Sequence, residues 1–118
     1  MEDRRKVNRR YLLYYMRIYD DATRRQIGNL VDITPQGMMA LSESPFPVGE
    51  TIRLHLELTE EVAAKPHMVV MGRSVWCKPD VTPNLYNVGF EILNLEADDK
   101  AIVQKIIEIF GFRDNQPG

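Results

Sequence analysis

Short stretches of alternating apolar and polar residues, separated by turn-forming residues, restrict the fold of this chain more than any other feature. In residues 51–58, an aliphatic side chain occupies every second position from Ile52 to Leu58. Successive side chains of a β-strand point to opposite faces, so this spacing predicts a strand with one buried face. The same reasoning, with proline, glycine and aspartate as strand breaks, predicts six strands, over residues 11–19, 25–33, 38–42, 51–58, 67–78 and 86–93. The fifth strand is expected to bend or bulge at Gly72.

The pattern changes from strand to helix near the C-terminus. Ile102, Ile106 and Ile109 recur at the i, i+4 and i+7 positions of a helix face. Asp98 suits the first turn of such a helix, and Gly111 suits the position after its end. Because strands and helices do not alternate, a parallel sheet is disfavoured. The sequence therefore predicts an all-β fold, an antiparallel barrel or sandwich, with one C-terminal helix.

Length and composition indicate one domain. The chain has 118 residues, 44% of them hydrophobic, which is enough for a single domain with its own core. Cys77 is the single cysteine, and no apolar run approaches the roughly 20 residues of a membrane helix, so we expect a cytoplasmic protein without a membrane span.

The charge of the chain is distributed unevenly. Eight basic and four acidic residues give residues 1–25 a charge of +4, which leaves −6 for the remainder. General nucleic-acid binders are more often basic overall.

A basic cluster near the N-terminus is suited to binding an anion. It contains Arg4, Arg5, Lys6, Arg9 and Arg10. Guanidinium groups present planar donor forks that match phosphate oxygens and also the O6/N7 edge of guanine. Such clusters are equally typical of solvated basic arms, so this cluster alone does not distinguish a ligand site from an exposed tail.

A second polar motif, the sequence DITPQG at 32–37, ends the predicted strand 25–33. Asp32 and Thr34 are two positions apart, so both point to one side of the strand and Ile33 points into the core. Gly37 permits a tight turn after the proline. In an alternative interpretation, the two polar side chains only satisfy the local backbone of a strand end.

Taken together, the two motifs resemble the two-part signature of the PilZ domain family, RxxxR followed by (D/N)xSxxG. Arg5 and Arg9 match the first part, and Arg4 matches an arginine that often precedes it. Residues 32–37 match the second part, with Thr34 in place of the usual serine. The hydroxyl is kept, but an extra methyl group must fit against a ligand.

The resemblance extends over nearly the whole chain, from Arg4 to about Phe112. Residues 72–76 (GRSVW) look like the G-x-V-x-W strand of the family, shifted by one position. Residues 88–91 (VGFE) resemble its V-G-(V/I)-x-F strand in a shortened form. The terminal helix also fits the family pattern.

This resemblance implies a six-stranded antiparallel β-barrel with a C-terminal helix, and a receptor for the bacterial second messenger cyclic di-GMP. It divides the chain into a ligand-binding arm (1–10), the barrel with its helix (11–112) and a tail (113–118). The arm would grip phosphates and guanine edges, while Asp32 and Thr34 would hydrogen-bond a guanine and Gly37 would permit their turn. The predicted ligand-binding residues are Arg4, Arg5, Arg9, Asp32, Thr34 and Gly37. Arg10 lies outside the motif and either contacts the ligand or pairs with an acidic residue.

Enzyme chemistry finds no support in the sequence. His55 and His67 occupy strand positions, and Cys77 has no CxxC partner. No phosphate loop, zinc-ligand spacing or nucleophile elbow occurs. We therefore predict no catalytic residue, no metal and no cofactor, with cyclic di-GMP as the only small ligand.

The predicted function is that of a ligand-switched adaptor in bacterial signalling, in motility or biofilm regulation. Ligand would dock the arm on the barrel and create a surface for an unidentified protein partner. One alternative is a PilZ-fold interaction module that does not bind nucleotide. Another is a nucleic-acid-binding barrel, which would need a basic face with exposed aromatic residues.

Overall fold

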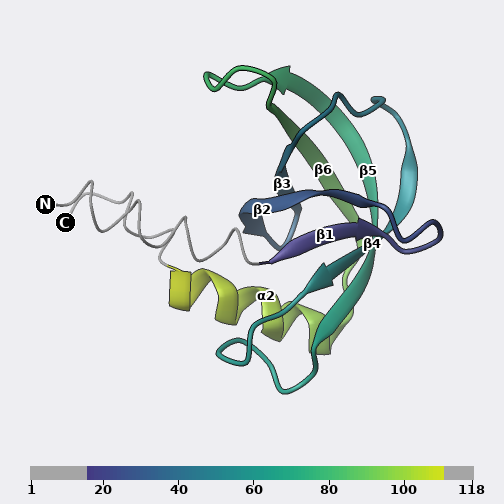
Figure 1. Cartoon of the computed structure of the whole chain (residues 1–118). Coiled ribbons are helices and arrows are strands. Elements are labelled where there is room, and N and C mark those ends of the chain that lie inside the picture. The colour runs from purple at the N-terminus through teal and green to yellow at the C-terminus, as the bar shows by residue number, and fades with distance from the viewer. Residues whose placement is uncertain (1–15, 111–118) are drawn as a thin grey trace, which may run out of the picture.

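The computed structural model describes residues 16–110, which form a closed antiparallel β-barrel with one helix (Figure 1). The elements are β1 (Arg17–Asp20), β2 (Gln26–Thr34), β3 (Gly37–Ser42), β4 (Thr51–Glu57), β5 (His67–Pro79), β6 (Tyr86–Asn94) and α2 (Ala97–Phe110). Around the barrel the order is β1-β2-β3-β6-β5-β4, and β1 pairs with β4 to close it. The predicted six-stranded antiparallel barrel with a C-terminal helix is confirmed.

The alternation of apolar residues located the strands closely. For five of the six predicted strands, β2 to β6, each end of the observed strand lies within one residue of the prediction. The predicted first strand, 11–19, overlaps β1, but its residues 11–15 lie outside the described part of the chain. The predicted arm (1–10) and tail (113–118) also lie outside it. A register shift between Met71 and Gly72 confirms the irregularity expected in the fifth strand.

The inward side chains of the strands build one continuous core. Ile18, Leu56 and Met68 face one another across β1, β4 and β5, and all three are buried. Fully burying an aliphatic side chain of this size contributes roughly 1.5–3 kcal/mol, so these rows are the main source of stability. The outward positions between them are left for polar groups and for function.

Helix α2 covers this core and packs against β2 (Figure 1). Val103, Ile106 and Phe110 are buried, and their spacing of three and four residues places them on one face of the helix. Val62, from the connection between β4 and β5, is buried in the same cluster. The helix therefore completes the core beside β2, the strand that carries Asp32 and Thr34.

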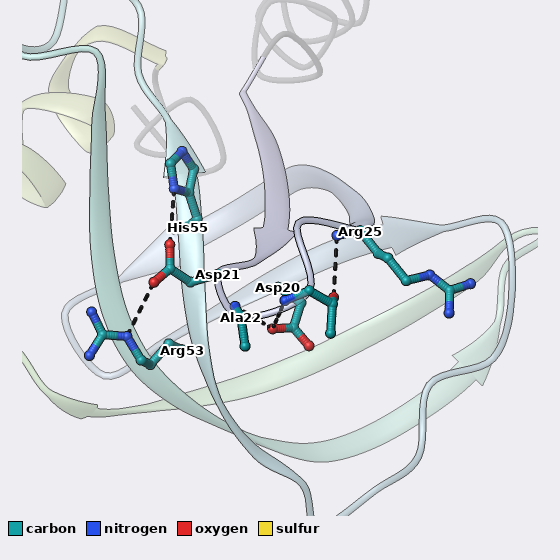
Figure 2. A network of polar contacts seen from close by, with 7 residues as sticks. Asp20, Asp21, Ala22, Arg25, Arg53 and His55 are labelled. Carbon is teal, nitrogen blue, oxygen red and sulfur yellow. Dashed lines mark hydrogen bonds and ion pairs between the residues drawn. The ribbon is translucent and has the colours of Figure 1, made fainter.

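Polar contacts join the turn after β1 to the outer face of β4 (Figure 2). The two carboxylate oxygens of Asp21 contact Arg53 Nε and His55 Nδ1 at 3.3 and 3.4 Å. His55 in turn stacks on His67 with 4.4 Å between ring centroids. We call Asp21, Arg53 and His55 the Asp21 cluster. Partial burial alone would raise the pKa of Asp21, but the hydrogen bond to His55 and the charge of Arg53 outweigh it and lower that pKa below 3.8.

Candidate functional site

The predicted binding residues Asp32 and Thr34 lie on the outer face of the barrel, where β2, β3, β6 and β5 are neighbours. The strand register places Asp32 opposite Met39, Met39 opposite Gly89, and Gly89 opposite Trp76. These outward positions form a row across the four strands. We call the surface with Asp32, Thr34, Met39 and Trp76 the candidate ligand face.

Two strand irregularities turn the key side chains of this face outward. Residues two apart in a regular strand share a face, yet Leu30 is fully buried and Asp32 is exposed. A register shift between Leu30 and Asp32 accounts for the reversal. On β5, Ser74 is buried, and a second shift between Ser74 and Trp76 brings the indole to the outer face. Bulges commonly re-aim side chains beside functional sites, and here two of them meet in one row.

A shallow pocket of about 270 Å³ occupies the candidate ligand face. It is lined by Asp32, Ile33, Thr34, Gly37, Met38, Met39, Val75, Trp76, Gly89 and Phe90. Three of the predicted ligand-binding residues, Asp32, Thr34 and Gly37, therefore border one cavity. Ligand pockets usually measure roughly 300–1,000 Å³, so this one is sized for part of a ligand, such as a single base, and not for a whole dinucleotide.

Two glycines shape the floor of the pocket. A Cβ atom on Gly89 would lie 2.2 Å from the Trp76 ring, so only glycine lets the indole lie flat over β6. A Cβ atom on Gly37 would lie 2.6 Å from the Phe90 carbonyl oxygen. The φ of Gly37 is not positive, so this glycine serves the close approach of β3 to β6 and not the turn freedom expected from the sequence.

The polar groups of the face are oriented as the strand pattern predicted. Ile33 is 1% exposed, while Asp32 and Thr34 point outward. Asp32 Oδ1 accepts a hydrogen bond from the Ile33 amide at 2.9 Å, and Thr34 Oγ1 accepts one from the Gln36 amide at 3.2 Å. These local bonds, which the alternative interpretation expected, are therefore present. They fix the rotamers of both side chains, and each side chain remains exposed beside the pocket.

Trp76 is the residue of this face that sequence reasoning did not assign to the site. Its ring borders the pocket, and the Lys78 ammonium lies 5.6 Å from the ring centroid. The cue was that Val75 and Trp76 are adjacent apolar residues, which breaks the alternation of a regular strand and is consistent with a bulge. An indole face beside a carboxylate is suited to stacking a base whose edge is hydrogen-bonded.

The remaining predicted residues fall outside the described part of the chain. Arg4, Arg5, Arg9 and Arg10 belong to residues 1–15, so their placement against the candidate ligand face stays a prediction. Within residues 16–110, an ion pair at the edge of the face joins Arg73 Nη2 to Glu91 Oε1 at 2.6 Å. Glu91 lies opposite Gly37 in the register, so this pair borders the row that contains Thr34.

Comparison with known families settles the relationship that the motifs indicated. The family model for the PilZ domain matches residues 3–108. This chain belongs to the PilZ domain family. PilZ domains are regulatory binding modules and are generally receptors for cyclic di-GMP. No curated protein matches the chain.

A solved structure shows the same fold at low sequence identity. It is the Bacillus subtilis inhibitor of motility MotI/DgrA, which is 19% identical and superposes with a TM-score of 0.60. The match covers 79% of this chain and 44% of MotI, so this chain spans less than half of that protein. At this identity the likeness supports the barrel fold alone.

In this PilZ domain, the altered GxVxW strand has a structural explanation. Ser74 takes the inward position where the family has valine, and its hydroxyl donates to the Pro47 carbonyl at 2.6 Å and accepts from the Glu50 amide at 3.0 Å. The serine therefore ties β5 to the connection that precedes β4. Val75 is then the extra residue of the bulge, 43% exposed beside Trp76.

Residues 16–110 contain no group of three or more histidine, cysteine, aspartate or glutamate side chains that could hold a metal ion. In the same range, no helix is long and apolar enough to cross a bilayer.

Proposed function

We propose that this PilZ domain binds cyclic di-GMP on the candidate ligand face and acts as a cytoplasmic, ligand-switched adaptor without enzymatic activity. The observation that carries the proposal is the convergence of Asp32, Thr34 and Trp76 on one pocket, through two independent bulges. The family membership gives the expected ligand.

The chemistry of the pocket fits one guanine base of the ligand. The Asp32 carboxylate can accept hydrogen bonds from the N1–H and N2–H donors of guanine, an interaction that charge strengthens. The Thr34 hydroxyl can donate to or accept from the same base. The indole of Trp76 offers an apolar face on which a purine can stack.

The phosphates of the ligand need cations, and among residues 16–110 no arginine or lysine lines the pocket. We assign this role to Arg5 and Arg9, with Arg4, from the RxxxR motif. Two phosphates neutralise part of the repulsion within the arm, so ligand and arm would close on the barrel together. Closure of the arm would change the surface offered to a protein partner.

Isothermal titration of the full chain with cyclic di-GMP tests the proposal. Arg5→Ala and Asp32→Ala should each weaken binding strongly, and Arg10→Ala should weaken it less. Absence of binding at micromolar ligand would refute the receptor and favour the nucleotide-independent interaction module. Single-stranded oligonucleotides provide the remaining comparison, because a nucleic-acid-binding barrel would bind them with a steep dependence on salt.

A further inference from the structure

A second cavity lies away from the candidate ligand face, between helix α2 and the connection of β4 to β5. It is a groove of about 460 Å³. Its lining residues are Val62, Ala63, Ala64, Lys65, Asp98, Ala101, Ile102 and Lys105. Most of them are alanine or aliphatic, and three are charged, namely Lys65, Asp98 and Lys105. None of them is a predicted cyclic di-GMP ligand.

The walls of this groove are fixed by contacts that do not involve an occupant. Lys65 Nζ lies 3.3 Å from Asp99 Oδ1, which ties the β4–β5 connection to the first turn of α2. Val62 is anchored in the core, and its amide donates to the Thr59 carbonyl at 3.1 Å. The groove is therefore a preformed feature of the fold, and binding would not require its walls to be ordered first.

The openness of the groove indicates the kind of molecule that fits it. Ala64, Ala101 and Lys105 are exposed, and Ile102 is half-buried. Small-molecule sites usually enclose about 70–90% of their ligand, which a groove with exposed walls does not achieve. A polypeptide segment needs to bury only its apolar side chains, and small alanine walls let its backbone approach closely.

The charges at the two ends of the groove differ in sign. Asp98 and Lys105 are seven residues apart on α2, about 10 Å along the helix axis. Lys105 makes no ion pair with any residue in the 16–110 range, whereas Lys65 is paired with Asp99. An occupant is therefore favoured when its carboxylate lies at the Lys105 end and no carboxylate lies at the Asp98 end.

We propose that this groove docks a short amphipathic segment of a partner protein, with aliphatic side chains on the alanine and isoleucine floor and an acidic residue against Lys105. This goes beyond nucleotide binding, since it assigns a surface to the partner. The groove and the candidate ligand face are connected through β2, because α2 packs on the strand that carries Asp32 and Thr34.

A displayed library of random peptides, panned on the full-length protein with and without cyclic di-GMP, tests the proposal. Peptides that bind in either state should share aliphatic residues at helical spacing and an aspartate or glutamate at one end. For the best peptide, Lys105→Glu should weaken binding at least about fivefold, because an attraction is lost and a repulsion of similar size replaces it. Ala101→Tyr, at an exposed helix position, should fill the groove and abolish binding.

Lys100→Glu is the matched control, with the same charge change on the same helix but outside the groove lining. It should leave peptide affinity unchanged. The proposal is overturned if no peptide is enriched in either state, or if enriched peptides bind Ala101→Tyr and Lys105→Glu as tightly as the wild type. A wild-type dimer in sedimentation that Ala101→Tyr dissociates would also overturn it, since a second copy would then occupy the groove.

The same variants titrated with cyclic di-GMP separate the two proposals. Ala101 and Lys105 do not border the candidate ligand face, so both variants should bind the nucleotide as the wild type does. If the peptide experiment fails while the protein still binds cyclic di-GMP, the proposal of a docking site in the groove is refuted and the proposal of a nucleotide receptor stands.

Discussion

The Asp21 cluster and the candidate ligand face both place a carboxylate on the outside of the same barrel, half-buried at Asp21 and exposed at Asp32, but the two carboxylates have different roles. Asp21 joins the turn after β1 to two side chains of β4, so its charge holds separate segments together (Figure 2). The hydrogen bonds described for Asp32 and Thr34 come from backbone amides one and two residues away. The first arrangement serves stability, and the second presents oriented acceptors beside a pocket.

The largest expected effect is that of Asp32→Ala on ligand binding, and it distinguishes the binding role of Asp32 from the stabilising role of Asp21. Asp32→Ala should weaken cyclic di-GMP binding by about 10- to 100-fold, because a hydrogen bond to a charged group contributes roughly 1.5–3 kcal/mol. The midpoint of thermal unfolding should change little. Titration calorimetry and thermal unfolding of Asp32→Ala and Asp21→Ala measure the contrast, with Asp21→Ala expected to keep its affinity and to unfold earlier. Equal loss of affinity in both variants would abolish the distinction between the two regions.

Gly89→Ala should disturb the ligand face without altering any charge. The added Cβ would meet the Trp76 ring, so the indole must move, at a cost of about 1–3 kcal/mol in unfolding free energy. Trp76 is the one tryptophan of the chain, so its emission reports the movement directly. Urea unfolding followed by fluorescence gives both quantities, and an unchanged emission spectrum would show that the ring does not depend on this glycine.

Thr34 offers a smaller and more selective change. Thr34→Val keeps the shape but removes the hydroxyl, and it should weaken cyclic di-GMP binding by about 1 kcal/mol, near fivefold. Thr34→Ser keeps the hydroxyl and removes the methyl group, so its affinity should equal or exceed that of the wild type. Calorimetric titration of the pair decides whether the hydroxyl is used. If valine is tolerated as well as serine, Thr34 serves only the local turn.

The smallest expected effect is a pH dependence from the Asp21 cluster. The pKa of Asp21 is lower in the folded chain than its ordinary value of 3.8, so the cluster stabilises the fold fully above that pH. This contribution is lost as the pH falls through the lower, folded-state pKa. Unfolding of the wild type and Asp21→Asn should therefore differ most at neutral pH and converge in acid. A difference that is constant with pH would exclude the carboxylate charge as the cause.

Strand positions could be predicted from the sequence because alternation records burial directly. Leu54 and Leu56 are fully buried on β4, as their spacing required. The alternation of Asp32, Ile33 and Thr34 within the motif also followed from the sequence, but the bulge after Leu30 that turns Asp32 outward did not. Trp76 could not be assigned in the same way, because its direction depends on the bulge at Val75 and not on its own identity.

The role of Gly37 shows a similar limit. The sequence pattern indicated a turn glycine, whereas the structure shows a glycine required by the approach of the Phe90 carbonyl on a strand distant in sequence. Contacts of this kind arise from the pairing of β3 with β6, and local propensities do not contain them. The groove between α2 and the β4–β5 connection depends on the tertiary fold in the same way, because its two walls lie more than thirty residues apart in the sequence.

The pairing of β1 with β4 has a consequence for how a partner can bind. Because the sheet closes on itself, each of its six strands has a neighbour on both sides. Many proteins recruit partners by accepting an extra strand at an open sheet edge, which also exposes them to aggregation. Along the stretches where each strand is paired on both sides, the ring gives up that route and its hazard together. Recognition on those stretches relies on side chains, so its specificity can be altered by substitutions that leave the hydrogen-bond ladder untouched.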